Sequence, residues 1–207
     1  MSVLSQFKKP INYAEIGIDV GNAVLARGEV IAPGSTLHLF DITSKVKLVT
    51  DKITNKFNTK FSVIGYGVGD STDKQAVDKN FQIGDGEIHP LQNYNWDLLK
   101  LVAQNTVKFD YCYLDGSHDL TIDGFAYFLL DKLLLPGGYI EFDDYNWTFG
   151  KSGSCSPYPP VNNKLFKERY TEEQINTSHV KLIVDFLVKS NNNYIEIEKN
   201  RIYKKIK

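Results

Sequence analysis

The sequence predicts an α/β fold: a mostly parallel, seven-stranded sheet with helices on both faces, closed by an antiparallel hairpin. Three observations support this prediction. Short β-rich runs alternate with segments of helical periodicity along most of the chain, an order typical of parallel sheets. The last two β-rich runs, 193–198 and 201–206, are separated only by Lys199 and Asn200, which predicts a C-terminal hairpin. The length of 207 residues and the 42% hydrophobic content fit one domain, 1–207.

Each strand of the parallel part is predicted from a short run rich in β-branched and aromatic residues. These five runs are 11–18, 36–42, 60–69, 108–115 and 139–144. The helices are predicted from apolar residues at helical spacing. They cover 21–32, 43–58, 95–105, 120–135 and 171–190. Thr171 is the expected N-cap of the last helix, and Pro136–Gly138 stop the fourth. Residues 71–95, with one short helix, and 145–163 are expected to be long loops.

The composition and the charge argue against several classes of partner, although local charged patches remain possible. A net charge of −1 gives no electrostatic reason to expect nucleic acid or an anionic membrane as a partner. No run approaches the roughly 20 apolar residues of a membrane span, and the start of the sequence does not resemble a secretory signal. Of the two cysteines, Cys112 lies in an apolar run and Cys155 in a predicted loop. We therefore expect no disulfide and a cytoplasmic location.

The first two strand ends carry a pattern that suits a nucleoside. In sheets of this kind, ligands bind outside the carboxyl ends of the strands. Glu15, Gly17 and Gly21 form E-x-G-x-x-x-G at the first strand end, where glycine lets the backbone turn tightly and approach a ligand. Asp41 ends the second strand, where an acid can accept from both hydroxyls of a ribose. Turn glycines and a helix-capping acid are the structural alternatives, but together the signals favour an adenosine-type ligand.

The fourth and fifth strand ends carry acids instead. Asp115 follows the fourth strand, and Asp143 and Asp144 follow the fifth. Neighbouring carboxylates repel one another unless a proton or cation neutralises them, and oxygen ligands suit a hard divalent ion. His118, three residues after Asp115, has the residue type of a general base. The alternatives are solvated strand-end acids and an exposed or hydrogen-bonding loop histidine.

In chain order, these motifs resemble those of class I methyltransferases that use S-adenosylmethionine. The resemblance rests on Glu15-x-Gly17-x-x-x-Gly21, Asp41, "LDGSHD" (114–119) and "LLLPGGYIEFDDY" (133–145). It spans nearly the whole chain and is closest to small metal-dependent O-methyltransferases of the macrocin and catechol O-methyltransferase type. It implies a Rossmann-like fold. The short N-terminus departs from these families, many of which carry extra lid helices there. That leaves open a homo-oligomer in which a partner subunit contributes to the site.

The resemblance assigns roles to the residues at the cofactor side. Glu15 would lie near the methionine amino group, and Gly17 and Gly21 would lie beside the cofactor. Asp41 would bind the ribose hydroxyls. Asp70, after the third strand, would lie near the adenine, although it also reads as a turn acid before a helix.

The same resemblance implies Mg²⁺ or another hard divalent cation at Asp115, Asp143 and Asp144. Neither family has a histidine where His118 stands: the catechol type has a lysine there. The macrocin type has an aspartate at the position of Ser117.

The implied reaction is methylation of a small-molecule hydroxyl acceptor, such as a sugar or a polyhydroxylated natural product, with His118 as the base. The alternatives are a non-catalytic methyltransferase-like binding protein and a nicotinamide-dependent oxidoreductase. The oxidoreductase is disfavoured because G-x-G-x-x-G is absent and Asp19 replaces its second glycine.

Overall fold

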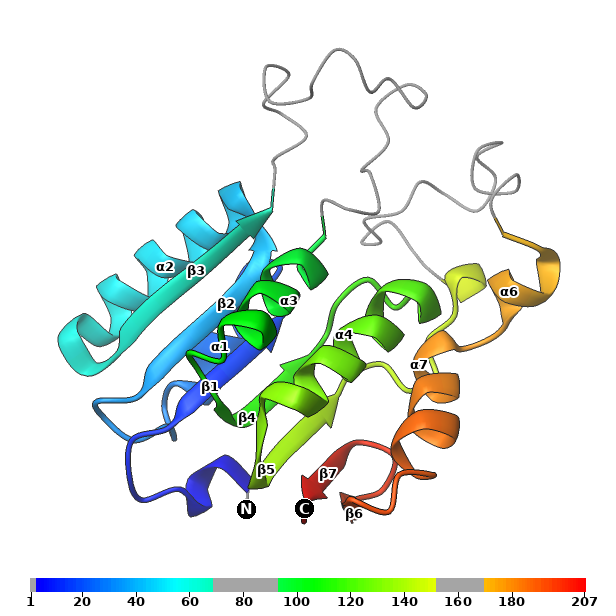
Figure 1. The fold of residues 1–207 in the computed structure, drawn as a ribbon. Helices are drawn as coiled ribbons and strands as arrows, with labels where there is room; N and C mark the ends of the chain where they lie inside the picture. The colour runs from blue at the N-terminus through cyan, green and yellow to red at the C-terminus, as the bar shows by residue number, and fades with distance from the viewer. Residues whose placement is uncertain (1–2, 69–92, 152–169) are drawn as a thin grey trace.

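The computed structural model describes residues 3–68, 93–151 and 170–207 and contains one seven-stranded sheet (Figure 1). The strands are β1 (Asn12–Ile16), β2 (Thr36–Ile42), β3 (Ser62–Val68), β4 (Phe109–Leu114), β5 (Leu134–Phe142), β6 (Tyr194–Glu198) and β7 (Ile202–Lys205). Their order across the sheet is β3-β2-β1-β4-β5-β7-β6. The first five strands pair in parallel, whereas β7 runs antiparallel to both β5 and β6. The predicted sheet and its terminal hairpin are therefore confirmed.

Helices cover both faces of this sheet, as predicted (Figure 1). They are α1 (Asn22–Arg27), α2 (Thr43–Phe57), α3 (Asn95–Gln104), α4 (Leu120–Leu133), α6 (Glu172–Asn176), α7 (His179–Leu182) and the π-helical turn η5 (Ile183–Val188). One hydrophobic cluster joins α1, α2 and the 3-10 turn η1 (Val3–Gln6) to one face. A second cluster joins α3, α4, α7 and η5 to the other face. Because β1 lies between β2 and β4, the sheet has its topological switch point at the end of β1, where such folds bind ligands.

The largest differences between the predicted and the observed elements occur at three places. The predicted helix 21–32 ends at Arg27, because the chain turns at Gly28. The predicted helix 171–190 is divided: α6 ends at Asn176, and Ser178 starts α7 by accepting a hydrogen bond from the Lys181 N–H. Strand β5 starts at Leu134 and so includes the Pro-Gly-Gly segment that was expected to precede it. A register shift against β4 accommodates this segment.

Several sequence predictions concern single residues or segments. Thr171 caps α6 as predicted, and its side chain accepts from the Gln174 N–H. Cys112 is a buried free cysteine. Residues 71–92, Asp70 and Cys155 lie outside the described residues. Within the described ranges, no helix is long and apolar enough to cross a membrane.

Candidate active site

The ends of β1, β2 and β4 are joined by backbone hydrogen bonds around Gly17. The Gly17 N–H donates to the Phe40 carbonyl at 2.9 Å, and the Asp115 N–H donates to the Ile16 carbonyl at 2.9 Å. Gly17 has a φ of +79°, and a β-carbon there would lie 1.9 Å from the Asp115 carbonyl oxygen. Only glycine fits this position. The predicted cofactor strand end and the predicted metal strand end are therefore in direct contact.

Asp41 lies beside the loop that follows β1. Its Oδ2 accepts from the N–H groups of Ile18 (2.9 Å) and Asp19 (3.2 Å), and its Oδ1 accepts from the Ile42 N–H at 2.7 Å. At the far end of this loop, Gly21 has a φ of +86° and immediately precedes α1. A carboxylate accepting three backbone N–H groups fixes the loop that would border a ligand at the switch point. The structure thus places Gly17, Gly21 and Asp41 around one loop.

Glu15 is fully buried on the α1 side of the sheet. Its Oε2 accepts from the Tyr13 hydroxyl, whereas its Oε1 has no hydrogen-bond partner in the described part of the chain. Burial raises the pKa of Glu15 to about 8, although the Tyr13 hydrogen bond and the Arg27 charge oppose the rise. A buried carboxylate oxygen without a partner carries a desolvation cost that a cationic group would relieve. Glu15 therefore suits an ammonium group.

Asp115, His118 and Asp144 form a group with metal-ligand chemistry. One ligand atom from each lies within 4.8 Å of the others. The His118 Nε2 lies 3.4 Å from the Asp115 Oδ1 and 3.4 Å from the Asp144 Oδ2. His118 and Asp144 both have positive φ, +57° and +53°. Such backbone strain in non-glycine residues is found preferentially at functional sites.

The electrostatics of this group follow from its geometry. Burial lowers the pKa of His118, but its contact with Asp115 and the charges of Asp123, Asp115 and Asp144 outweigh burial, so the net pKa is raised above 6.5. Burial raises the pKa of Asp144, and the charges of Asp143 and Asp115 add to the rise while His118 opposes it. At 3.4 Å these contacts are electrostatic rather than well-formed hydrogen bonds, and among the described residues the buried His118 Nε2 has no hydrogen-bond partner.

Asp143, which was predicted beside Asp144, has different neighbours in the structure. Its Oδ2 accepts from the Tyr113 hydroxyl, and its Oδ1 accepts from the Asp144 N–H at 2.9 Å. Both residues lie beyond the end of β5, and with its φ of +53° Asp144 reaches His118, whereas Asp143 faces Tyr113. Asp143 as a metal ligand stays a prediction.

The loop that carries His118 is held by two residues that sequence reasoning missed. Asp123, 1% exposed, accepts from the His118 N–H at 2.7 Å and from the Ser117 N–H at 3.1 Å. The Tyr94 hydroxyl also donates to Asp123. Gly116 is required here, because a β-carbon would lie 2.3 Å from the Tyr94 hydroxyl oxygen. In the sequence, Asp123 looks like an ordinary acid in the first turn of a helix.

Aromatic residues after β5 cover the His118 side of the site. The Trp147 ring lies 4.8 Å from the His118 ring and 5.1 Å from the Phe149 ring. Phe149 is 1% exposed and is a core anchor of this segment. Tyr145 donates to Asp185 at 2.9 Å. The structure therefore places Trp147 against the candidate base.

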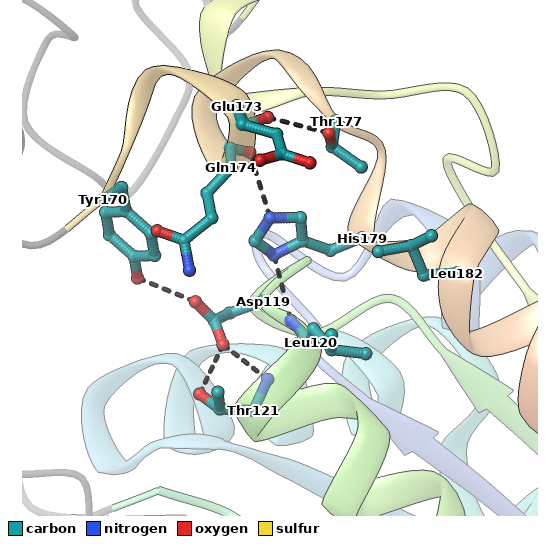
Figure 2. A pocket seen from close by; sticks show the side chains of 9 residues that line it. All are labelled: Asp119, Leu120, Thr121, Tyr170, Glu173, Gln174, Thr177, His179 and Leu182. Atoms are coloured by element: carbon teal, nitrogen blue, oxygen red, sulfur yellow. Dashed lines mark hydrogen bonds between the residues drawn. The ribbon is translucent and has the colours of Figure 1, made fainter.

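A pocket of about 380 Å³ lies between the start of α4 and α6 (Figure 2). Its buried polar groups already have partners. Asp119 accepts from the Thr121 N–H and from the Tyr170 hydroxyl, each at 2.7 Å. The His179 Nδ1 accepts from the Leu120 N–H at 3.1 Å, and its Nε2 lies 3.0 Å from the Gln174 carbonyl oxygen. These contacts hold α6 and α7 against α4. The residues that line the pocket do not include Asp115, His118 or Asp144.

Comparison with known proteins identifies the fold. The sequence matches no protein-family model and no curated protein. Solved structures match along most of the chain. An O-methyltransferase from Bacillus cereus in complex with S-adenosylhomocysteine (SAH) has a TM-score of 0.53 and 14% identity, with 95% of this chain and 74% of that chain covered. A putative O-methyltransferase from Klebsiella pneumoniae has a TM-score of 0.56 and 11% identity, with 99% and 76% covered.

MycE, a methyltransferase of the mycinamycin biosynthetic pathway in complex with Mg and SAH, has a TM-score of 0.51 and 17% identity. That match covers 99% of this chain and 48% of MycE. The chain therefore has the Rossmann-like fold of class I methyltransferases, which the sequence motifs predicted.

Proposed function

We propose that the protein is an S-adenosylmethionine-dependent O-methyltransferase, assisted by a divalent metal ion. Its acceptor would be a hydroxyl of a small molecule, such as a sugar or a polyhydroxylated natural product. One observation carries the proposal: Asp115, His118 and Asp144 converge at the switch-point edge of the sheet, beside Gly17. The fold that presents them is shared with O-methyltransferases whose structures contain SAH.

The residues at the end of β1 fit the cofactor. The buried Oε1 of Glu15, which no described residue pairs with, suits an ammonium group, the charged end of S-adenosylmethionine. The loop between Gly17 and Gly21 is fixed by Asp41, whose side chain is mostly buried at the end of β2. An acid at that position can bind ribose hydroxyls. Glu15, Gly17, Gly21 and Asp41 would hold the cofactor, and Asp70 stays a prediction beside the adenine.

The donor set at the end of β4 fits a hard divalent ion such as Mg²⁺. Two carboxylates and an imidazole lie within reach of one another, and nothing in the described ranges forms a hydrogen bond with the buried His118 Nε2. A cation would offset the repulsion between Asp115 and Asp144. Carboxylate oxygens are the ligands that such ions prefer, so Asp115 and Asp144 would hold the ion. Asp143 would contribute as a third ligand or as a neighbour.

The chemistry follows from these positions. When bound, S-adenosylmethionine supplies an electrophilic methyl group, and the divalent ion supplies positive charge that lowers the pKa of a hydroxyl. The His118 Nε2 would accept the hydroxyl proton, because that nitrogen forms no hydrogen bond with any described residue. Asp123 fixes the His118 backbone, and Trp147 packs against its ring and excludes water from one side. Positioning of both reactants would provide much of the acceleration.

Mass spectrometry tests this proposal directly. The full chain is incubated with S-adenosylmethionine and candidate diols, with Mg²⁺ or with a chelator, and the products are searched for the mass gain of one methylene group. We expect transfer only with the metal. His118→Ala should lower turnover about a hundredfold or more while SAH binding is unchanged. Full activity in excess chelator would contradict the proposal that a metal ion assists the reaction. SAH binding without transfer to any acceptor would favour the non-catalytic alternative.

A further inference from the structure

Tyr113, on β4, connects the two strand ends that carry the acids. Its hydroxyl donates to the Asp143 Oδ2 and lies 3.3 Å from the Asp115 Oδ2. These carboxylates follow neighbouring parallel strands, β4 and β5. Tyr113 is 3% exposed, so water does not replace its hydroxyl easily. A buried donor placed between two carboxylates fixes their orientation and reduces their repulsion.

The Tyr113 ring is held by the Arg27 side chain, which packs over it. The Arg27 guanidinium carbon lies 3.5 Å from the ring centroid. Arg27 also pairs with the Glu141 Oε1 at 3.0 Å, and the Arg201 Nη2 lies 2.7 Å from the same oxygen. A desolvated guanidinium over a tyrosine ring is an attractive contact, and the ion pair restrains the guanidinium. The hydroxyl therefore has little freedom to leave the two carboxylates.

This restraint determines which acid reaches His118. Both Asp143 oxygens are engaged, one by the Tyr113 hydroxyl and the other by the Asp144 N–H. The Asp115 Oδ2 faces Tyr113, whereas its Oδ1 lies 3.4 Å from the His118 Nε2. Tyr113 therefore orients Asp143 and the Oδ2 of Asp115. The Oδ1 of Asp115 then faces Asp144 and His118.

We propose that Tyr113 is a positioning residue of the divalent-ion site: its hydroxyl, held by Arg27, orients Asp115 and Asp143 so that Asp115 and Asp144 present their oxygens to one ion. The inference rests on the metal-assisted function proposed above. A residue that orients a metal ligand is often nearly as important for affinity as the ligand. Tyr113 does not touch the reacting atoms in this assignment.

Binding of Mn²⁺, a spectroscopic substitute for Mg²⁺, tests this role in the full chain. Electron paramagnetic resonance measures free Mn²⁺ during titration of the wild type, Tyr113→Phe and Tyr111→Phe. Tyr111 is the matched control, because it is 1% exposed and its hydroxyl donates to Glu141 rather than to Asp115 or Asp143. We expect Tyr113→Phe to weaken Mn²⁺ binding about 10- to 100-fold. Tyr111→Phe should leave it unchanged, and neither change should alter SAH affinity.

Each outcome separates this inference from the proposed function. Equal Mn²⁺ affinity in Tyr113→Phe and the wild type overturns the positioning role and leaves the metal site standing. A wild type that binds no Mn²⁺ overturns the metal site and the positioning role together, while SAH binding still reports on the transferase. If Tyr113→Phe does not fold, Arg27→Lys replaces it, since lysine keeps the charge but loses the planar contact with the ring. An unchanged Mn²⁺ affinity in a folded Arg27→Lys would then overturn the inference.

Discussion

Gly17→Ala should separate the two strand ends that form the candidate site. The new β-carbon would lie 1.9 Å from the Asp115 carbonyl oxygen, 2.6 Å from its carbonyl carbon and 2.9 Å from the Gly116 Cα. All three atoms belong to the backbone, so no rotamer change relieves the contact. The end of β4 must retreat by about 1 Å, and the hydrogen bond from the Asp115 N–H to the Ile16 carbonyl must lengthen.

The expected cost has two parts. A non-glycine residue in the left-handed region costs roughly 1–2 kcal/mol, and overpacking a rigid contact adds typically about 1–3 kcal/mol. Gly17→Ala should therefore reduce the unfolding free energy by about 2–5 kcal/mol. Gly137→Ala is the matched control, because Gly137 has a φ of +88° but no atom of the described residues lies within 4 Å of its β-carbon position. Gly137→Ala should show only the cost of placing a non-glycine residue in the left-handed region, roughly 1–2 kcal/mol.

Urea unfolding of both variants, followed by far-UV circular dichroism, gives the two unfolding free energies. Calorimetric titration with SAH should show at least tenfold weaker binding for Gly17→Ala, since one such factor corresponds to about 1.4 kcal/mol. Gly137→Ala should bind SAH as the wild type does. If Gly17→Ala is no less stable than Gly137→Ala and keeps its SAH affinity, the close contact between the strand ends is refuted.

Three further changes address single groups. Asp41→Ala should weaken SAH binding by about 1–3 kcal/mol through lost charge-assisted hydrogen bonds, and an unchanged calorimetric affinity would contradict the ribose role. Asp144→Asn should lose Mn²⁺ affinity in a resonance titration and keep SAH binding; retained Mn²⁺ affinity would remove Asp144 from the ligands. Glu15 has a pKa of about 8 when folded, against 4.5 ordinarily. As the pH rises, Glu15 ionises first in the unfolded chain, because its pKa is lower there. The stability that protonated Glu15 contributes is therefore present below pH 4.5 and lost by about pH 8. Over this range the unfolding free energy should fall by about 1.4 kcal/mol per pH unit. Glu15→Gln should lack this slope in urea unfolding at several pH values, and an identical slope would contradict the burial effect.

Much of the fold could be predicted because alternation and periodicity are local signals. The five parallel strands and the terminal hairpin each carry their own β-rich run. The errors occur where local signals are ambiguous. Gly28 ends α1 within a run that still reads as helical, and Ser178 starts a new helix inside the predicted 171–190.

The candidate site was also predicted only in part from local signals. Asp115 and His118 were found together because they follow one strand, and Asp144 because the next strand ends beside it. Their supporting contacts have no sequence signature. Tyr94 and Asp123 are 29 positions apart, and Tyr113 and Asp143 are 30 apart. Such pairings depend on how α3, α4 and β5 pack, which no short motif encodes.

The most direct test of the account is whether the wild-type chain binds an S-adenosyl cofactor. Isothermal titration with SAH, and separately with NAD⁺, measures this without knowledge of the acceptor. The arrangement of Glu15, Gly17, Gly21 and Asp41 predicts saturable binding of SAH, one molecule per chain, and no binding of NAD⁺. Binding of NAD⁺ with no binding of SAH would contradict the account and favour a nicotinamide-dependent oxidoreductase.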